Sequence, residues 1–358
     1  MARGANGSRL RVAVLFGGRS AEHDVSIMSA TNAVRALDPE KYDVLPVFVT
    51  RDGVWLLSRF EGGELARPED GVRLSLLPGG RGRIVALDEA GGARELPAID
   101  ILFPVLHGPH GEDGSVQGLA EVAGVALAGC GILGSATAID KDIAKRLLNE
   151  AGLPTAPAVV IHPNEIPAFA DLERQLGLPV FLKPARQGSS VGVSKVATEA
   201  EFKAALEEGF RHDRKLLAET FVAGREVECS VLEGPGGELF VSRTGEIAPA
   251  ASHGFYSYDA KYVDAEGAVI KVPADLPKNV EDAIRETATR AFRALGCDAM
   301  ARVDFFLKPD MSFLVNELNT IPGFTDISMY AKAMAASGVS YAEVIDRLIA
   351  HGLARATA

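Results

Sequence analysis

Hydrophobic and polar residues follow two different periods along the chain. Short apolar runs rich in β-branched residues, such as residues 42–49 and 300–307, indicate β-strands. Other stretches, such as residues 279–295, place apolar residues three or four positions apart, which indicates helices with one buried face. Because the two kinds of segment alternate, the pattern predicts an α/β fold.

The expected elements run through most of the sequence. Strands are expected at residues 9–16, 42–49, 99–106, 125–128, 158–161, 180–183, 216–219, 226–232, 300–307 and 313–319. Helices are expected at residues 25–37, 117–123, 141–151, 168–176, 199–208, 279–295, 329–336 and 341–353. The pattern is lost at residues 51–98, where Gly, Pro and mixed charge predict a loop or hairpin insertion, and residues 249–262 are irregular.

The length sets the number of domains. A chain of 358 residues is expected to hold two or three of them. The pattern places three, at residues 1–136, 137–224 and 225–358. With 47% hydrophobic and 24% charged residues, the composition is that of a globular protein that can bury a large core.

The charge balance excludes whole classes of partner. The chain has 48 acidic and 37 basic side chains, a formal net charge of −11. Such a surface repels polyanions, which argues against general nucleic-acid binding and against attachment to an anionic membrane. Contacts with phosphate groups must therefore come from a local cluster of basic residues.

The cysteines and the absence of a targeting segment indicate a cytoplasmic protein. Three cysteines, Cys130, Cys229 and Cys297, form no Cys-x-x-Cys pair, which argues against a disulfide framework and a zinc ribbon. The polar N-terminus lacks the apolar core of a signal peptide. Residues 122–139 carry no charge, but their glycines and hydroxyl groups predict a strand, a turn and the start of a helix rather than a membrane span.

The last two expected strands carry polar residues two positions apart. Arg302 and Asp304 share one strand face, and so do Glu317 and Asn319 on the next strand. A connection containing Pro309 makes these strands a natural hairpin.

The register of this hairpin decides which polar groups meet. If Leu307 pairs with Leu314, Asp304 lies opposite Glu317, and the guanidinium of the first strand lies opposite the amide of the second. Two carboxylates and an amide oxygen around one point suit Mg²⁺. A solvated hairpin face with an Arg–Glu ion pair is the alternative, and the spacing alone does not decide between them.

A Gly/Ser-rich loop follows the expected strand at residues 180–183. Lys183 ends the strand, and Gly188, Ser189, Ser190 and Gly192 follow. Such a loop can offer backbone N–H groups and an ammonium to phosphates. It is not a Walker A loop, because no Gly-Lys-Ser/Thr follows, and a plain connector is the alternative interpretation.

Three further local patterns each have two interpretations. Gly129-Cys130-Gly131-Ile132-Leu133-Gly134 matches the dinucleotide fingerprint, but no acidic residue ends a second strand about twenty positions later, which favours a simple turn. Glu22 stands at a helix entrance, where a capping carboxylate is the alternative to a functional one. His107 ends a buried strand, where α/β sheets place ligands; a hydrogen-bonding core histidine and a metal cluster with His110, Glu112 and Asp113 are the alternatives.

Five segments in order along the chain match the motifs of one family. They are Gly17-Gly18-Arg19-Ser20-Ala21-Glu22-His23-Asp24-Val25-Ser26, His107-Gly108-Pro109-His110-Gly111-Glu112-Asp113-Gly114, Asp140-Lys141, the loop of residues 183–192, and Asn316-Glu317-Leu318-Asn319-Thr320-Ile321-Pro322-Gly323-Phe324-Thr325 with Ser328-Met329-Tyr330. Over nearly its whole length the chain resembles the D-alanine–D-alanine ligases of the ATP-grasp superfamily. The resemblance implies a three-domain ATP-grasp fold with a Rossmann-like N-terminal domain.

The reaction implied by the resemblance has two stages. ATP phosphorylates the carboxylate of one D-alanine, and the amine of a second D-alanine attacks the acyl phosphate. The product, D-alanyl-D-alanine, serves peptidoglycan synthesis. The resemblance also implies Mg²⁺, for which Mn²⁺ can substitute, and a homodimer.

The resemblance assigns roles to individual residues. ATP-binding residues are expected to be Lys141, Lys183, Ser190, Glu219, Phe221, Val222, Glu226, Lys261 and Asn316, with Thr220-Phe221 departing from the Lys-Trp of some relatives. Metal ligands are expected to be Asp304, Glu317 and Asn319. D-Alanine is expected to contact Glu22, His107, Arg302, Gly323, Ser328 and Met329, and the catalytic set is Glu22, Ser189, Tyr262, Arg302 and Gly323.

Three rival functions differ in their requirements. Another ATP-grasp carboxylate–amine ligase would use a different amino acid, and Glu22, Tyr262 and Ser328 argue for D-alanine. A regulatory nucleotide-binding module would be expected to lack a metal ligand. A nicotinamide oxidoreductase rests only on the glycines of residues 129–134.

Overall fold

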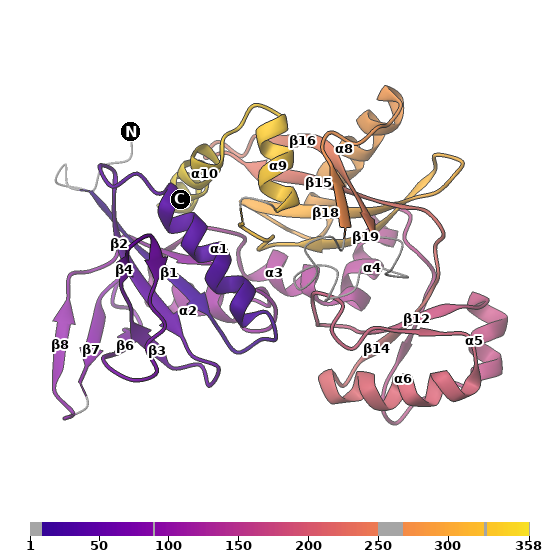
Figure 1. The fold of residues 1–358 in the computed structure, drawn as a ribbon, viewed down its shortest axis with the longest axis horizontal. Helices are drawn as coiled ribbons and strands as arrows, with labels where there is room; N and C mark the ends of the chain where they lie inside the picture. The colour runs from indigo at the N-terminus through magenta and orange to yellow at the C-terminus, as the bar shows by residue number, and fades with distance from the viewer. Residues whose placement is uncertain (1–8, 89, 250–267, 326–327, 358) are drawn as a thin grey trace.

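The computed structural model describes residues 9–88, 90–249, 268–325 and 328–357. Three main β-sheets, each built from a consecutive stretch of the sequence, occupy separate regions of the molecule (Figure 1). The α/β class predicted from the sequence is confirmed. The domain boundaries at residues 136 and 224 stay a prediction.

The first sheet has eight strands in the order β10-β9-β1-β2-β3-β6-β7-β8. Four of them are parallel, as expected for strands joined by helices: β1 (Leu10–Gly17), β2 (Tyr42–Val49), β9 (Ile101–Pro104) and β10 (Ala126–Leu127). The helices of this region are α1 (His23–Ala36), α2 (Ser115–Ala123) and α3 (Ile132–Ile139). Strand β1 is almost wholly apolar because it is buried between two parallel neighbours.

The insertion at residues 51–98 extends this sheet. Its antiparallel strands are β3 (Trp55–Leu57), β6 (Arg73–Leu76), β7 (Ile84–Leu87) and β8 (Ala93–Leu96), and a separate pair is formed by β4 (Phe60–Glu61) and β5 (Glu64–Leu65). The sequence predicted a loop or hairpin here. The hairpin is confirmed, but strands of two to four residues are too short for a recognisable period.

The second sheet is antiparallel and has the order β11-β14-β12-β13. Its strands are β11 (Ala158–Ile161), β12 (Val180–Pro184), β13 (Ser194–Val196) and β14 (Leu216–Thr220), and the helices of this stretch are α4 (Lys141–Glu150), α5 (Phe169–Leu176) and α6 (Glu199–His212). Helix α6 covers the sheet by packing Phe202 and Ala205 against Leu182 and Leu216.

Helix α6 begins with a reciprocal cap. The Thr198 hydroxyl accepts from the backbone N–H of Glu201 at 3.3 Å, and the Glu201 carboxylate accepts from the backbone N–H of Thr198 at 3.0 Å. We expect Thr198→Ala to lower the free energy of unfolding by about 1 kcal/mol. Thr198→Ser keeps the acceptor and should unfold like the wild type in urea titrations; equal losses in both variants would contradict the cap.

The third sheet has the order β17-β16-β15-β18-β19. Its strands are β15 (Arg225–Glu233), β16 (Leu239–Pro249), β17 (Ala268–Lys271), β18 (Met300–Leu307) and β19 (Phe313–Asn319), and the helices are α8 (Lys278–Ala294), α9 (Met329–Ala336) and α10 (Tyr341–Ala356). The sequence did not predict β16 or β17. The expected irregular segment overlaps β16 at Pro249, and its other residues lie outside the described part.

The predicted hairpin of β18 and β19 is confirmed in the half that carries the polar residues. Asp304 pairs with Glu317, and Arg302 pairs with Asn319. The predicted pairing of Leu307 with Leu314 is wrong, because a β-bulge after Asp304 shifts the register by one and Leu307 pairs with Phe313.

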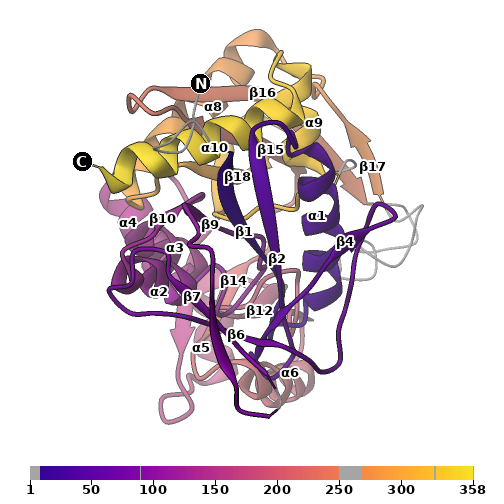
Figure 2. The ribbon, with the colours of Figure 1, turned by 90° about the vertical axis from the view of Figure 1, so that its left-hand side faces the viewer.

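Helix α10 joins the first and third sheets. Leu348 and Ile349 pack in one apolar cluster with Phe103 of β9, Leu232 of β15 and Met300 of β18. In Figure 2 this C-terminal helix passes over β9 and β10, which it contacts. A continuous core therefore fixes the N-terminal motifs relative to the β18–β19 hairpin.

Two expectations about the environment can be compared with the fold. The uncharged residues 122–139 form the end of α2, strand β10 and helix α3 as expected, and within the described ranges no helix combines the length and apolarity of a membrane span. All three cysteines are free and buried.

Candidate active site

A cavity of about 350 Å³ lies where the second and third sheets face each other. Most of the residues expected to bind ATP or metal line it. They are Lys141, Lys183, Ser190, Glu219, Phe221, Val222, Glu226, Asn316, Asp304 and Glu317. The catalytic candidates Ser189 and Arg302 line the same cavity. Residues far apart in the sequence thus share one surface.

Two lysines share one buried carboxylate at this cavity. Glu219 on β14 is 3% exposed and contacts Lys183 of β12 at 2.5 Å and Lys145 of α4 at 2.6 Å. Burial alone raises the pKa of Glu219, but the two ammonium groups outweigh it and hold the pKa below its usual 4.5. For Lys183 burial lowers the pKa, and Glu219 outweighs that effect, so Lys183 stays charged and can meet phosphates.

We expect Glu219→Gln to destabilise the fold by about 2 kcal/mol, because two buried ammonium groups lose their counter-charge. The contribution of Glu219 is full above pH 4.5 and is lost as the pH falls through its lowered pKa, so the gap between variant and wild type should shrink in acid. Urea unfolding at pH 7 and pH 4 measures it. The exposed pair of Glu208 and Arg211 supplies the control: Glu208→Gln should cost at most about 1 kcal/mol.

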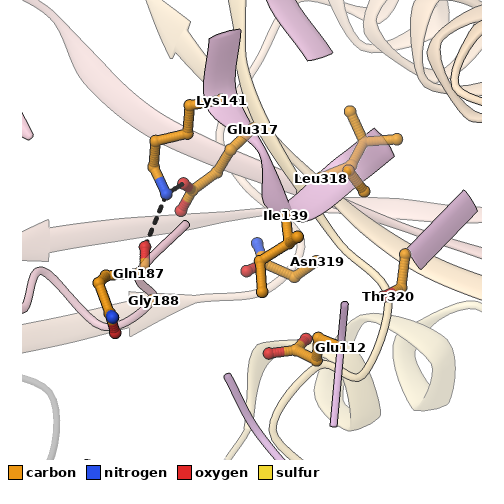
Figure 3. A pocket seen from close by; sticks show the side chains of 10 residues that line it. Glu112, Ile139, Lys141, Gln187, Gly188, Glu317, Leu318, Asn319 and Thr320 are labelled. Carbon is orange, nitrogen blue, oxygen red and sulfur yellow. Dashed lines mark hydrogen bonds and ion pairs between the residues drawn. The ribbon is translucent and has the colours of Figure 1, made fainter. Parts of the chain in front are cut away.

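Lys141 links the loop of residues 186–193 to the β18–β19 hairpin. Its ammonium donates to the Gln187 carbonyl at 2.8 Å and lies 3.2 Å from the Glu317 carboxylate, as Figure 3 shows. Asp140 caps helix α4 by accepting from the N–H of Ile143, which fixes where Lys141 starts the helix.

Arg302 lies among carboxylates from two neighbouring strands. It bonds both oxygens of Asp304 at 2.7 Å and contacts Glu228 on β15 at 2.9 Å. Burial lowers the pKa of Arg302, but Asp304 and Glu228 outweigh it and raise the pKa above its usual value. The amide of Asn319 donates to Asp304 at 3.0 Å. Arg302 therefore presents a fixed cationic fork at the cavity.

The donor set at the hairpin fits a hard divalent cation. Asp304 and Glu317 supply carboxylate oxygens and Asn319 an amide oxygen, the chemistry that Mg²⁺ or Mn²⁺ accepts. No group of three or more His, Cys, Asp or Glu side chains suited to a metal exists within the ranges that the structure covers. The alternative metal cluster around His107 is therefore not supported.

Glu22 meets the Gly/Ser loop across the molecule. The Ser189 hydroxyl donates to its carboxylate, and Glu22 makes no side-chain cap to α1. Space beside the carboxylate is tight, since a Cβ at Gly188 would lie 2.8 Å and a Cβ at Gly108 3.0 Å from a Glu22 oxygen. Glu22 is 8% exposed, and its carboxylate links the start of α1 to the Gly/Ser loop. This favours the functional interpretation over the cap.

His107 is a buried, neutral hydrogen-bonding residue. Burial lowers the pKa of His107 below its usual 6.5. Nδ1 donates to the Ile321 carbonyl at 2.9 Å, and Nε2 lies 3.0 Å from the Ser29 hydroxyl. Nearby, burial and the Glu22 carboxylate raise the pKa of Glu112 to about 8. The interpretation of His107 as a core-edge hydrogen-bonding residue thus agrees with its contacts.

Aromatic and aliphatic groups line the other end of the cavity. Phe221 is 42% exposed, its ring centroid lies 5.9 Å from that of Phe181, and Lys195 lies 5.3 Å from the centroid. Val222 and Glu226 line the same end. A flat apolar surface with a carboxylate suits a nucleoside, since a base can stack on it.

The remaining expected residues follow β19. Gly323 lies in the segment between β19 and α9, and Ser328 precedes Met329, the first residue of α9. The Ser328 hydroxyl oxygen is buried and finds no hydrogen-bond partner among the residues described, as expected of a group that awaits a ligand. Lys261 and Tyr262 lie outside the described residues.

Sequence reasoning missed two charged residues at this site, Lys145 and Glu228, which contact Glu219 and Arg302 respectively. It named Glu112, which contacts Ile321, only within a family motif and in the alternative metal cluster. Lys145 lies one helical turn after Lys141, and Glu228 lies two positions after Glu226 on a strand. The helical and strand spacings place each of them on the same face as an expected site residue, so both could have been predicted. Of the glycines of residues 129–134, Gly131 precedes the first residue of α3 and donates its N–H to Asp298 at 2.5 Å, and Gly134 lies within α3.

Known proteins resemble this chain throughout its length. A family model described as D-ala D-ala ligase N-terminus matches residues 11–130, and one described as D-ala D-ala ligase C-terminus matches residues 147–350. The D-alanine–D-alanine ligase A of Brucella suis biovar 1 (strain 1330) is 67% identical over 347 residues, covering 97% of this chain and 98% of the relative. The corresponding ligase A of Mesorhizobium japonicum is 59% identical over 352 residues, covering 97% and 98%.

Two solved structures share the fold. The D-alanine–D-alanine ligase from Coxiella burnetii is 34% identical with a TM-score of 0.85, covering 98% of this chain and 95% of that one. The VanG D-Ala:D-Ser ligase from Enterococcus faecalis is 35% identical with a TM-score of 0.81, covering 96% and 99%.

Proposed function

The chain belongs to the D-alanine–D-alanine ligase family, and from this membership we propose that it uses ATP to join two D-alanine molecules into D-alanyl-D-alanine for peptidoglycan synthesis. The observation that supports this most is the convergence of separate motifs. Lys141, Lys183, Arg302 and Glu317 line one cavity, and Glu22 reaches it through Ser189.

In the first step a carboxylate oxygen of one D-alanine attacks the γ-phosphorus of ATP, and ADP leaves. Lys141 and Lys183 hold the phosphates, and Glu22 binds the ammonium of that D-alanine. Asp304, Glu317 and Asn319 would hold Mg²⁺ or Mn²⁺, which supplies positive charge that neutralises the transferring phosphoryl group. Glu219, Phe221 and Val222 would lie along the adenine, with Glu226 at the ribose, and Ser190 and Asn316 complete the nucleotide set.

In the second step the deprotonated amine of the other D-alanine attacks the acyl carbon. The Arg302 guanidinium and the Gly323 N–H stabilise the oxyanion of the tetrahedral intermediate, where fixed donors have their largest effect. The attacking nitrogen loses one proton, the carbon–oxygen bond to phosphate breaks, and the leaving phosphate takes up that proton, so that dipeptide and inorganic phosphate form. His107 supports this site, and Ser328 and the Met329 N–H would bind the carboxylate of the second D-alanine.

The proposal extends to closure of the site, the oligomeric state and the compartment. Lys261 and Tyr262 would close the site, with Tyr262 completing the hydrogen-bonded set of Glu22 and Ser189. Closure would exclude water, which otherwise hydrolyses the acyl phosphate. A homodimer in the cytoplasm, the compartment where ATP is available, completes the proposal.

Product analysis tests the proposed function. The purified protein is incubated with ATP, Mg²⁺ and D-alanine, and ADP and dipeptide are quantified against L-alanine and amino-acid-free controls. We expect equimolar ADP and D-alanyl-D-alanine with D-alanine only. ADP without dipeptide would point to another acceptor, with D-serine and D-lactate tried next, and ATP binding without ADP would favour the regulatory module.

A further inference from the structure

Two side chains from the loop after β9 of the first sheet hold the segment that carries Gly323 at a residue before this glycine. The Ile321 N–H donates to Glu112 at 3.0 Å, and the Ile321 carbonyl accepts from His107 at 2.9 Å. The backbone N–H and the carbonyl of Ile321, two positions before Gly323, are thus both bonded by side chains of the loop that follows β9. Figure 3 shows a smaller pocket that shares Lys141 and Glu317 with the 350 Å³ cavity, with Glu112 on the side opposite Lys141.

The same segment is held from its C-terminal side. The Phe324 N–H donates to the Ser29 hydroxyl oxygen at 3.2 Å, and the Phe324 carbonyl accepts from the Tyr341 hydroxyl at 2.7 Å. Ser29 lies on α1 and is fully buried, and Tyr341 begins α10. The Gly323 peptide therefore sits between two residues whose backbone groups are all paired with side chains.

The two supports are connected by one ordered set of hydrogen bonds. Because His107 donates through Nδ1 to Ile321, its Nε2 must accept, so the Ser29 hydroxyl donates to Nε2 while its oxygen accepts from Phe324. Every donor in this set of hydrogen bonds has one acceptor. Such a fully satisfied buried network holds one geometry.

The network also reaches Glu22. The Ser20 hydroxyl donates to the His107 carbonyl at 2.7 Å and accepts from the Glu22 N–H at 3.1 Å, and the second oxygen of Glu112 accepts from the Gly108 N–H at 2.7 Å. Residues expected to bind the first D-alanine are thus tied to the segment that presents the Gly323 N–H.

We propose that Ser29 and Glu112 are positioning residues that fix the peptides flanking Gly323, so that its N–H points to the place where the oxyanion forms. They act through Ile321, His107 and Phe324. The inference rests on the proposed function, because it concerns the donor of the second step. A donor of this kind must lie within about 2.7–3.1 Å of the oxyanion, and a misplacement of about 1 Å can cost about 100-fold in rate.

Two variants remove these supports. Glu112→Gln replaces one of two accepting oxygens by an amide nitrogen, which has no lone pair to offer, so one backbone N–H loses its partner. Ser29→Ala removes the acceptor of Phe324 and the donor to His107. The matched controls are Asp113→Asn, whose carboxylate accepts from the nearby N–H groups of His110 and Ser115, and Thr31→Val, whose hydroxyl bonds the Ile27 carbonyl within α1.

The test compares three readouts. We expect both variants to lower kcat about 10- to 100-fold with the KM for ATP changed less than about threefold. The affinity for a phosphinate dipeptide analogue, whose tetrahedral phosphorus mimics the intermediate, should fall by the same factor as kcat/KM, while the affinity for a non-hydrolysable ATP analogue stays constant. Both controls should match the wild type in all three.

Each other outcome contradicts a stated part of the account. An active wild type with unchanged kcat and phosphinate affinity in both variants would overturn the positioning role. Equal losses of ATP-analogue and phosphinate affinity would show a purely structural role and also overturn it. A wild type that forms no dipeptide would overturn the proposed function, and this inference with it. If Ser29→Ala fails to fold, Glu112→Gln decides alone.

Discussion

Replacing Glu317 by Gln is expected to lower kcat by about 1000-fold or more while the protein stays folded. Glu317 lies 3.2 Å from Lys141 and opposite Asp304 on the hairpin, at the place proposed for the divalent cation. The substitution keeps the shape and removes one negative charge. A cation held by one carboxylate fewer neutralises the transferring phosphoryl group less well, and several kcal/mol of transition-state stabilisation depend on it.

Two measurements separate this loss from general damage. Mn²⁺ binding in the presence of ADP, followed by electron paramagnetic resonance, should weaken together with kcat, whereas the melting temperature should stay within a few degrees. Asp310→Asn is the matched control, since this exposed carboxylate in the same hairpin bonds Ser312. Turnover near that of the wild type in Glu317→Gln would refute the metal-site assignment.

Substitutions of Arg302 are expected to affect both catalysis and stability. Arg302→Lys keeps the charge but loses the planar fork that bonds both oxygens of Asp304, so kcat should fall about 100- to 1000-fold with little change in the KM for ATP. Arg302→Met should lower kcat further. It should also cost about 3–5 kcal/mol in unfolding free energy, because Glu228 and Asp304 lose their buried counter-charge.

A double variant distinguishes the two effects. In Arg302→Met/Glu228→Gln one buried carboxylate is neutral, so part of the lost stability should return, measured by urea unfolding, while kcat stays at the level of Arg302→Met. Recovery of activity along with stability would mean that Arg302 acts only by holding the fold together.

The polar hairpin could be predicted because it depends on local periods. Residues two apart on a strand share a face whatever the rest of the fold does, so the meeting of Asp304 with Glu317 followed from spacing and one hairpin. The bulge after Asp304 could not be predicted, since it changes the register at Leu307 without a Gly or Pro to mark it.

Contacts between distant segments account for most of what the sequence did not reveal. Glu112 and Ile321 are separated by 209 positions and Ser29 and Phe324 by 295, and no local pattern relates such pairs. Glu22 shows the same limit, because its sequence neighbourhood favoured a helix cap. Its contact with Ser189, 167 positions away, and the lack of a side-chain cap to α1 separate the two interpretations.

The most direct measurement of the central claim follows the oxygen of the activated carboxylate. D-Alanine labelled with ¹⁸O in its carboxylate is incubated with the protein, ATP and Mg²⁺, and the phosphate released is examined by mass spectrometry. An acyl-phosphate route transfers one ¹⁸O to inorganic phosphate for each dipeptide formed, with ADP as the nucleotide product. Unlabelled phosphate, or ¹⁸O recovered in AMP, would contradict the phosphorylation of D-alanine that Lys141, Lys183 and Glu317 are proposed to promote.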